Sequence, residues 1–269
     1  MPTGGFAGGI FDVDGVLVDS PHERAWRESL RDLMENEWAD IRGRTGWSAD
    51  RFTPQVYQQV MSGKPRTSGA LAGLEYFGVP DARTRAGTYA DRKQTLLVKL
   101  IEAGQFHAYP DALRFVLAVR AAGIRTAAAS SSKNAHLVLR RIRLDTLAAQ
   151  EGLTYDFLRP GLTLLDFFDA DLSGRDFARG KPDPEIFVTS AAELGSPPGD
   201  CFVVEDAVSG IQAARAGRMA ALAVARADDA GPLAAAGADL VVSTLDEVDL
   251  PGLAAHRLAR RSAGSPAGR

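Results

Sequence analysis

The sequence predicts an α/β fold, in which a parallel sheet flanked by helices carries an inserted helical cap. From about residue 108 onward, short β-rich runs alternate with segments of helical length, which is typical of a parallel sheet. Roughly ninety residues of different character separate the first strand from this series, far more than an ordinary α/β connection needs. A chain of 269 residues has room for one large domain or two unequal ones.

The expected strands follow one another in order along the chain. The first covers residues 9–13, and the later ones are IRTAAAS (124–130), LLDFF (164–168), CFVVE (201–205), MAALAVA (219–225) and LVVS (240–243). The segments between them have the punctuation of helices: PDALRFVLAVRAAG ends in Gly123, PEIFVTSAAELG runs from Pro184 to Gly195, and AVSGIQAARAG ends in Gly217. Each of these helices can serve as a crossover between parallel strands.

Residues 20–106 contain mainly helix-like segments, and we expect them to form the cap. The alternative is a helical face of the main domain; the cap is favoured because loops at the carboxyl ends of parallel strands are where such sheets build sites. The expected boundaries are 1–19 and 107–250 for the core, 20–106 for the cap, and 251–269 for a C-terminal helix and tail. The stretch RRSAGSPAGR (260–269) is expected to be disordered because it has nothing to bury.

The composition of the chain indicates which kinds of binding partner to expect. A net charge of -3 gives no reason to expect binding to nucleic acid or to an acidic membrane, and no apolar run approaches a membrane-spanning length. The single cysteine, Cys201, excludes an internal disulfide and a cysteine-built metal site, which suits a reducing compartment. We expect a cytoplasmic monomer or weak homodimer that acts on a small molecule.

The stretch GGIFDVDGVLVDS (8–20) places Asp12, Asp14 and Asp19 at the end of an apolar run. A calcium loop is disfavoured because Val16 and Val18 occupy positions where that pattern needs polar side chains. A solvated surface turn does not account for the apolar residues between the charges. A third interpretation is a loop that carries a nucleophile and binds magnesium.

The magnesium interpretation explains why the carboxylates are close together. Clustered carboxylates raise one another's pKa unless a cation neutralises them, and Mg²⁺ prefers carboxylates, water and substrate phosphate. Asp12 is the candidate nucleophile that takes up a phosphoryl group. Asp14 is the candidate acid and base, which protonates the leaving oxygen and later deprotonates water. Gly15 allows a tight turn beside the metal.

Phosphoryl transfer also needs donors on the phosphate, and the strand that ends at Ser130 offers them. Ser130 supplies a hydroxyl, and the following SSKNAH, with Ser131 and Asn134, supplies amides at a helix start that could hold phosphate. The alternative is simple capping of that helix by a serine.

Two further segments offer a cation and more carboxylates. RGKPDPEIF places Lys181 where its ammonium could pair with the phosphate and with Asp12, although a lone lysine is usually solvated. FVVEDAVSG ends a strand in Glu205 and Asp206, candidate metal ligands whose alternative role is again a helix cap. Four strand-end segments with the right chemistry, in order, are hard to attribute to caps alone.

With these four segments, the chain resembles the haloacid dehalogenase superfamily of aspartyl-phosphate enzymes, most closely its β-phosphoglucomutase-like group with a helical cap. DVDGVL is similar to the first motif of that family, Ser130 to the second, Lys181 in GKPDPEIF to the third and VEDAVSGIQAA to the fourth. The resemblance covers nearly all of residues 9–245. It implies a Rossmann-like, doubly wound parallel sheet core with the first strand at its centre.

The resemblance also implies a cofactor and its ligands. Mg²⁺ would be held by the Asp12 side chain, the Asp14 main-chain carbonyl and Asp206, with Glu205 assisting. Asp12 and Asp206 would then face each other across adjacent strand ends. All of these implied ligands lie in the expected core.

In the cap, the resemblance implies three substrate-binding residues. His22 in HERAW would lie near Asp14, Arg66 in SGKPR would grip the distal end of the substrate, and Lys93 in DRKQ would reach the site. The alternatives are an exposed first-turn histidine and solvated helix ends. Two departures put the substrate in doubt: Ser62 stands where mutase caps carry a lysine, and residues 145–163 look like an insertion.

The favoured function is a Mg²⁺-dependent phosphatase of a small phosphorylated metabolite such as a sugar phosphate. The runner-up is a mutase of the β-phosphoglucomutase type, which returns the phosphoryl group to a different hydroxyl. A dehalogenase is disfavoured because Asp14 is present. A non-catalytic binding protein would be expected to have lost one of Asp12, Asp14, Lys181 or Asp206, and all four are retained.

Overall fold

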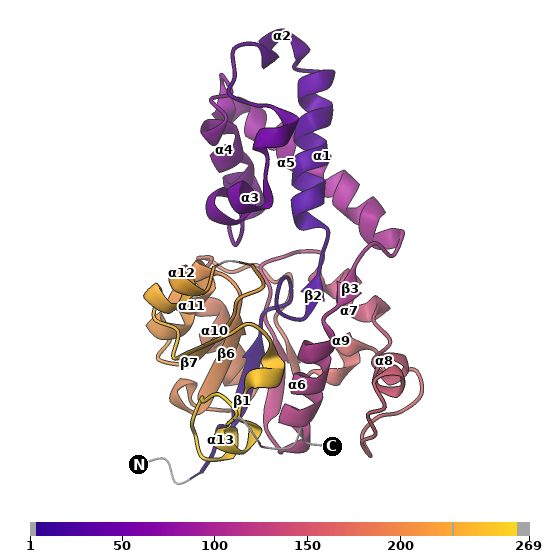
Figure 1. Ribbon diagram of the computed structural model, residues 1–269, viewed down its shortest axis with the longest axis vertical. Helices are drawn as coiled ribbons and strands as arrows, with labels where there is room; N and C mark the ends of the chain where they lie inside the picture. The colour runs from indigo at the N-terminus through magenta and orange to yellow at the C-terminus, as the bar shows by residue number, and fades with distance from the viewer. Residues whose placement is uncertain (1–3, 228, 263–269) are drawn as a thin grey trace. The chain divides into compact units, whose positions relative to one another are not determined.

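The computed structural model describes residues 4–227 and 229–262, and its contacts divide the chain into two compact units (Figure 1). The first unit comprises Met1–Asp19 and His107–Arg269, and the second comprises Ser20–Phe106. Of the expected C-terminal tail, the described part includes a short helix and Arg260, which forms a β-bridge with Val248. Residues 263–269 lie outside the described residues.

The first unit is built on a six-stranded sheet in which every pairing is parallel. The strand order is β5-β4-β1-β6-β7-β8, so β1 has a neighbour on each side. Phe11 at the end of β1 lies opposite Ala128 of β4 and Val204 of β6, which brings the carboxyl ends of the three strands to one edge. The α/β prediction is confirmed. The strands are β1 Gly8–Phe11, β4 Arg125–Ala128, β5 Ala170–Asp171, β6 Cys201–Glu205, β7 Ala220–Val224 and β8 Leu240–Val242.

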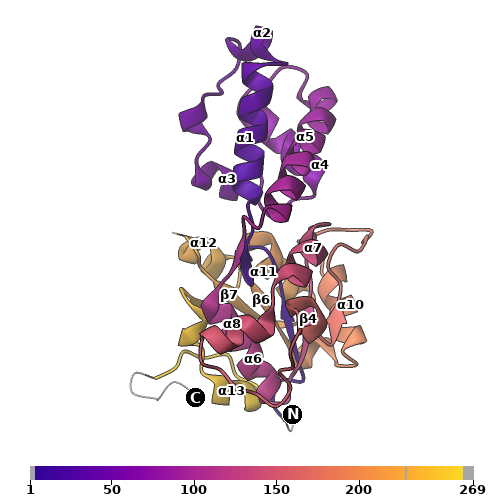
Figure 2. The same ribbon diagram turned by 90° about the vertical axis from the view of Figure 1, so that its right-hand side faces the viewer.

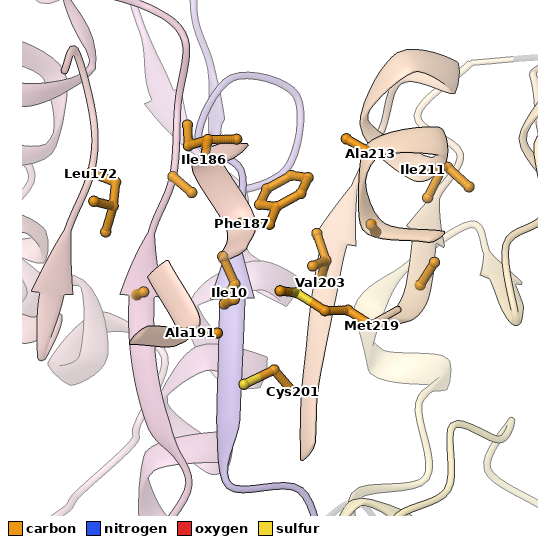
Figure 3. Close-up of a cluster of buried hydrophobic side chains, with 14 of the residues drawn as sticks. Ile10, Leu172, Ile186, Phe187, Ala191, Cys201, Val203, Ile211, Ala213 and Met219 are labelled. Carbon is orange, nitrogen blue, oxygen red and sulfur yellow. The ribbon is translucent and has the colours of Figure 1, made fainter. Parts of the chain in front are cut away.

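Alternate residues of the central strands face opposite helical layers, as a doubly wound sheet requires. On one face, Ile10 of β1 and Val203 of β6 belong to a buried cluster with Phe187 of α10 (Figure 3). On the other face, the ring of Phe11 lies 6.1 Å from that of Phe115 of α6. Both layers are buried, which is why these strands carry few polar residues.

The helices of the first unit connect successive strands, and α6 and α8 lie on the same side of the sheet (Figure 2). Their bounds are α6 Pro110–Ala121, α7 Ala135–Arg141, α8 Leu144–Gln150, α9 Leu164–Phe167, α10 Glu185–Glu193, α11 Val208–Ala216, α12 Ala230–Ala235 and α13 Leu250–Ala254, with 3₁₀ turns at Pro198–Asp200 and Leu245–Glu247. The three crossover helices predicted from glycine and proline punctuation are present.

The strand predicted over LLDFF (164–168) is wrong. Residues Leu164–Phe167 form the single turn α9, and the strand β5 follows at Ala170–Asp171. The physical reason is a cap: the Thr163 hydroxyl accepts a hydrogen bond from the backbone N–H of Asp166 at 3.2 Å, which favours a helical turn there. A short apolar run does not by itself distinguish strand from helix.

The segment 145–163 begins within α8 and returns through a loop to the start of that helix. Leu144 donates its N–H to the carbonyl of Leu162 at 2.9 Å, and Arg143 forms a β-bridge with Thr163. Within the loop, Asp145 accepts the N–H of Gly161 at 2.9 Å. These bonds close the segment on itself between β4 and β5, and its being an insertion stays a prediction.

The second unit is a helical bundle with its own core. Trp26, Leu30 and Leu33 follow one another on the buried side of α1 at the spacing of an amphipathic helix. The hydroxyl of the buried Tyr89 on α5 donates to the carbonyl of Trp26 at 2.9 Å. The helices are α1 His22–Glu35, α2 Ala39–Arg42, α3 Pro54–Val60, α4 Arg66–Tyr76 and α5 Ala82–Glu102, with a 3₁₀ turn at Ala49–Arg51.

The chain leaves and re-enters the first unit through a two-stranded ribbon. β2 (Val18–Asp19) pairs in antiparallel fashion with β3 (His107–Ala108), so the two connections run side by side. In the described part of the chain, no helix is both long enough and apolar enough to span a bilayer.

Candidate active site

The turn after β1 presents the first two predicted carboxylates. Asp12 continues the sheet by donating its N–H to the carbonyl of Val204 at 3.0 Å. The chain then folds back on itself, because Gly15 donates to Val18 at 2.8 Å. Gly15 has φ = 87°, and a Cβ at that position would lie 2.0 Å from a carboxylate oxygen of Asp206. Glycine is therefore required there by both backbone conformation and space.

A buried ion-pair network lies at the ends of β1 and β6. The Lys181 ammonium donates to Oδ1 of Asp12 and to Oε1 of Glu205, each at 2.5 Å. The Lys181 side chain is 5% exposed and that of Glu205 1% exposed. The predicted pairing of Lys181 with Asp12 is thus present in the structure. Charged groups at this depth persist only when they are paired, and here one cation serves two carboxylates.

Glu205 also holds the start of the next loop. Its second carboxylate oxygen, Oε2, accepts the backbone N–H groups of Asp206 at 3.1 Å and Ala207 at 3.2 Å. Gly210 of α11 leaves room for it, since a Cβ there would lie 1.9–2.3 Å from the Glu205 carboxyl group. Both oxygens of Glu205 therefore have donors from this chain. The helix-cap alternative is not met, because α11 has no side-chain cap hydrogen bond and the N–H groups that Glu205 accepts belong to the two residues before the helix.

The carboxylates shift one another's pKa. Burial raises the pKa of Asp12 to about 7; Lys181 opposes this, and Glu205 and Asp14 add to it. Burial, together with Glu205 and Asp12, raises the pKa of Asp206 well above 3.8. Burial disfavours the Lys181 ammonium, but the carboxylates of Asp12 and Glu205 outweigh this and raise its pKa. More carboxyl groups therefore lie at this edge of the sheet than the Lys181 ammonium pairs with, and burial and their mutual repulsion oppose their ionisation.

The loop after β4 brings Ser130 to the same place. The buried Ser130 hydroxyl donates to Oδ2 of Asp14 at 3.4 Å and accepts the N–H of Ser132 at 3.1 Å. Asn134 is buried directly before α7, whereas Ser131 is exposed. No serine side chain caps α7, whose first turn follows Asn134. We call residues 12–18, which follow β1, the carboxylate loop. Of the predicted phosphate-binding residues, Ser130 therefore contacts the carboxylate loop directly.

The donor set matches the chemistry of Mg²⁺. Asp206 has a carboxylate to which no described residue donates a side-chain hydrogen bond or ion pair, and it adjoins Gly15. Carboxylate and carbonyl oxygens are the ligands that Mg²⁺ prefers, and a divalent cation would favour the ionised forms of these carboxyl groups. Among the described residues, no three His, Cys, Asp or Glu side chains surround one metal position. A set with two carboxylates and the main-chain carbonyl of Asp14 does not require three.

The second unit contains the other predicted residues. His22 is the first residue of α1, and its Nδ1 lies 3.1 Å from the ammonium of Lys93 on α5. Lys93 is buried and lies 4.9 Å above the ring of Trp26, so the alternative of a solvated helix end is wrong for it. Arg66 is exposed at the first residue of α4. The expected proximity of His22 to Asp14 stays a prediction.

Arg226 and Tyr109 contact the loop after β1 and were missed at the sequence level, as was Asp111, which pairs with Arg226. Arg226, two residues beyond β7, donates to the carbonyls of Gly15 and Val16. It pairs with Asp111 of α6 and lies over the ring of Tyr109. The available signal was position: Arg226 follows a strand of the same parallel sheet, at the edge where the other site residues lie.

Comparisons with known proteins agree with this geometry. The sequence profile of the haloacid dehalogenase-like hydrolases matches residues 9–218. β-Phosphoglucomutase of Mycobacterium tuberculosis is 32% identical over 255 residues, covering 89% of this chain and 90% of that protein. Hexitol phosphatase B of Escherichia coli is 27% identical over 246 residues, covering 89% of this chain and 92% of that protein.

A solved structure has the same architecture. The archaeal β-phosphoglucomutase of Pyrococcus sp. superposes with a TM-score of 0.64 at 26% identity, covering 91% of this chain and 96% of that one. The four predicted segments, which carry Asp12, Ser130, Lys181 and Asp206, meet at the carboxyl edge of one parallel sheet. The chain is thus an enzyme of the haloacid dehalogenase-like hydrolase family, in its β-phosphoglucomutase-like group.

Proposed function

We propose that this protein catalyses Mg²⁺-dependent phosphoryl transfer through Asp12, with hydrolysis of a phosphorylated sugar as the net reaction. The observation that carries the proposal is the buried Lys181 ammonium, which bridges Asp12 and Glu205 at 2.5 Å each. An ammonium so placed favours the ionised form of Asp12 and orients its carboxyl group, and it can also stabilise the oxygens of an incoming phosphate.

The first half of the reaction transfers the phosphoryl group to the protein. An oxygen of Asp12 attacks phosphorus, and the bond between phosphorus and the sugar oxygen breaks. Asp14 donates its proton to that leaving oxygen, so the sugar departs as an alcohol. Lys181 and the Ser130 hydroxyl bind phosphate oxygens, on which charge is spread in the transition state.

The second half regenerates the nucleophile. Asp14, now a carboxylate, removes a proton from a water molecule that attacks phosphorus. The bond between phosphorus and Asp12 breaks, inorganic phosphate leaves, and Asp14 holds the proton needed for the next cycle. The hydrogen bond between Ser130 and Asp14 supports this assignment because it fixes the Asp14 carboxyl group beside the proposed phosphate site.

Mg²⁺ is the proposed cofactor, with the Asp12 side chain, the Asp14 carbonyl and Asp206 as its ligands and Glu205 assisting. When bound, it supplies positive charge that offsets the carboxylates and the phosphate. The pKa of Asp12, which burial raises to about 7 even with the Lys181 ammonium beside it, supports this need, because the nucleophile must be ionised. His22, Arg66 and Lys93 are the proposed substrate contacts in the second unit.

A mutase is the second candidate, in which the phosphoryl group on Asp12 returns to another hydroxyl of the sugar. The relatives named β-phosphoglucomutase favour it, at 32% identity against 27% for the hexitol phosphatase. The cap favours hydrolysis, because Ser62 replaces the lysine of mutase caps, and the nearby Lys64 donates to the carbonyl of Val60 in its own unit. The chemistry at Asp12 is common to both.

A screen of sugar phosphates with Mg²⁺ tests both candidates, provided that it measures free phosphate and isomerised sugar phosphate together. We expect phosphate release that Asp12→Asn abolishes and that chelation of Mg²⁺ suppresses. Conversion of β-glucose 1-phosphate into glucose 6-phosphate without net phosphate release would establish the mutase instead. Unchanged turnover by Asp12→Asn would refute Asp12 as the nucleophile in either reaction.

A further inference from the structure

Arg226 lies two residues beyond the end of β7 and uses its guanidinium group on the loop that carries Asp14. Its Nε donates to the carbonyl of Gly15 at 3.2 Å, and one terminal nitrogen donates to the carbonyl of Val16 at 3.1 Å. The Arg226 side chain is 17% exposed. Two consecutive peptide groups, directly after Asp14, are thereby attached to a different strand of the sheet.

The guanidinium is itself held on its other sides. Its second terminal nitrogen donates to both oxygens of Asp111 at 2.9 and 3.1 Å. Asp111 in turn accepts the hydroxyl of Thr244 at 3.0 Å and the N–H of Leu245 at 2.8 Å. Asp111 is therefore fixed from both α6 and the 3₁₀ turn at Leu245–Glu247, and it gives Arg226 a rigid anchor.

Tyr109 also holds Arg226, and its ring lies against the guanidinium group. The centre of its ring lies 3.8 Å from the Arg226 guanidinium carbon, a cation–π contact that restricts the side chain. The backbone N–H of Tyr109 also donates to the carbonyl of Leu17 at 3.0 Å. The loop after Asp14 is thus bonded at three successive carbonyls, those of Gly15, Val16 and Leu17.

A purely structural ion pair would look different. Arg215 donates to both oxygens of Asp239 at 2.7 and 2.9 Å, and no bond links that pair to the loop after β1. Arg226 divides its donors between a carboxylate and the two peptides next to the predicted acid and base. Planar guanidinium groups suit such fixed, divided recognition because the directions of their N–H bonds are set.

We propose that Arg226 is a positioning residue that fixes the Asp14 carboxyl group for proton transfer to the leaving oxygen. The inference rests on the proposed function, in which Asp14 is the general acid. If the peptides of Gly15 and Val16 are released, Asp14 loses its fixed approach to the substrate, although every group that touches phosphate remains. A misplacement of about 1 Å in a catalytic group can cost about 10²-fold in rate.

The test compares Arg226→Met with the matched control Arg215→Met on phenyl phosphates of graded leaving-group acidity. The measured quantity is kcat/KM, which reports phosphoryl transfer to Asp12. We expect Arg226→Met to lose about 10²-fold on phenyl phosphate and much less on 2,4-dinitrophenyl phosphate, because a good leaving group needs no proton. Arg215→Met should retain wild-type values on every substrate.

A second pair of variants keeps the test valid if Arg226→Met does not fold, which circular dichroism and a thermal melt would show. Arg226→Lys keeps a charge beside Asp111 but cannot donate to both carbonyls and the carboxylate together. Asp111→Asn leaves Arg226 in place but weakens its anchor. Both should show the same dependence on the leaving group, with a smaller loss than Arg226→Met.

The outcomes separate this inference from the function on which it rests. An equal loss on all leaving groups, or no loss, would overturn the positioning role, while abolition of turnover by Asp12→Asn would leave the proposed function intact. If the unmodified protein turned over neither the aryl phosphates nor any sugar phosphate with Mg²⁺, the proposed function would be wrong and the inference with it.

Discussion

Gly210, the third residue of α11, offers a prediction in which two opposing effects can be weighed. Replacing glycine by alanine within a helix usually stabilises a protein by up to about 1 kcal/mol. At Gly210, however, the new Cβ would lie 1.9–2.3 Å from the carboxyl group of Glu205. That carboxyl group is not a flexible surface end, because Lys181 and two backbone N–H groups hold it.

The size of the effect follows from the bonds that must lengthen. A Cβ contact shorter than 3.0 Å is essentially never observed, so the Glu205 carboxyl group would have to recede by about 1 Å. Its bonds to the N–H groups of Asp206 and Ala207 already measure 3.1 and 3.2 Å and would not survive that shift. Hydrogen bonds to charged groups contribute about 1.5–3 kcal/mol each. We therefore expect Gly210→Ala to be destabilising by about 2–5 kcal/mol, after the helical gain is subtracted.

Urea denaturation followed by far-ultraviolet circular dichroism measures this change. Gly231→Ala, in the first turn of α12 with no atom within 4 Å of its Cβ, is the matched control and should be neutral or slightly stabilising. In a Glu205→Ala background the clash is absent, so Gly210→Ala should there become neutral or stabilising. A protein in which Gly210→Ala alone is as stable as the wild type would refute the reasoning.

Four other perturbations have expected signs. Lys181→Met leaves two buried carboxylates without their cation and should lower stability by about 3–5 kcal/mol, measured by denaturation, along with loss of turnover. Mg²⁺ should raise the thermal midpoint of the unmodified protein but not of Asp206→Asn, and an equal rise in both would exclude Asp206 as a ligand. Burial opposes the Asp111 carboxylate, but hydrogen bonds from Arg226 and the Leu245 N–H outweigh it and hold the pKa of Asp111 below 3.8. Because that pKa is depressed in the folded state, its stabilisation is full above pH 3.8 and lost as the pH falls further, so Asp111→Asn should flatten the acid limb of a stability–pH profile. Gly87→Ala, inside α5 with open space around it, should stabilise the second unit by up to about 1 kcal/mol, read from the fluorescence of its three tryptophans.

Much of the fold could be predicted because the signals are local. Strands such as Cys201–Glu205 are continuous apolar runs bounded by turn residues, as strands buried on both faces must be. The failure at Leu164–Phe167 has the opposite cause: an apolar run of the same kind follows Thr163, whose side chain caps a helical turn. One capping bond decided a choice that hydrophobicity left open.

The predicted site residues share a property that made them visible from the sequence. Asp12, Ser130 and Glu205 each follow or end a buried strand, and parallel pairing brings such positions to one edge. Lys181 was found through its proline-rich turn. Asn134 could be named from its place after a strand and Lys93 from the resemblance, but their burial could not be predicted, because it depends on contacts between segments far apart in the chain.

Arg226 shows where sequence reasoning ends. Its anchor Asp111 is 115 positions away, and the carbonyls that it binds are 210 and 211 positions away. An arginine after a strand is ordinarily solvated, and nothing local indicates that this one faces inward. Its role became visible from the sheet order, in which β6 alone separates β7 from β1, so that the end of β7 lies near the loop that follows β1.

The carboxyl groups at the ends of β1 and β6 connect the folding of the first unit to its chemistry. Asp12, Asp14, Glu205 and Asp206 act on one another there, and the Lys181 ammonium pairs with two of them. A chain selected for stability alone would replace such a buried network by apolar side chains, which is often neutral or stabilising. The network lies against glycines whose Cβ atoms would collide with Glu205 and Asp206, so the backbone is shaped around the carboxyl groups. Ionising all of these carboxyl groups together would favour a further cation beside the Lys181 ammonium at the end of β1, where the proposed phosphoryl transfer needs both.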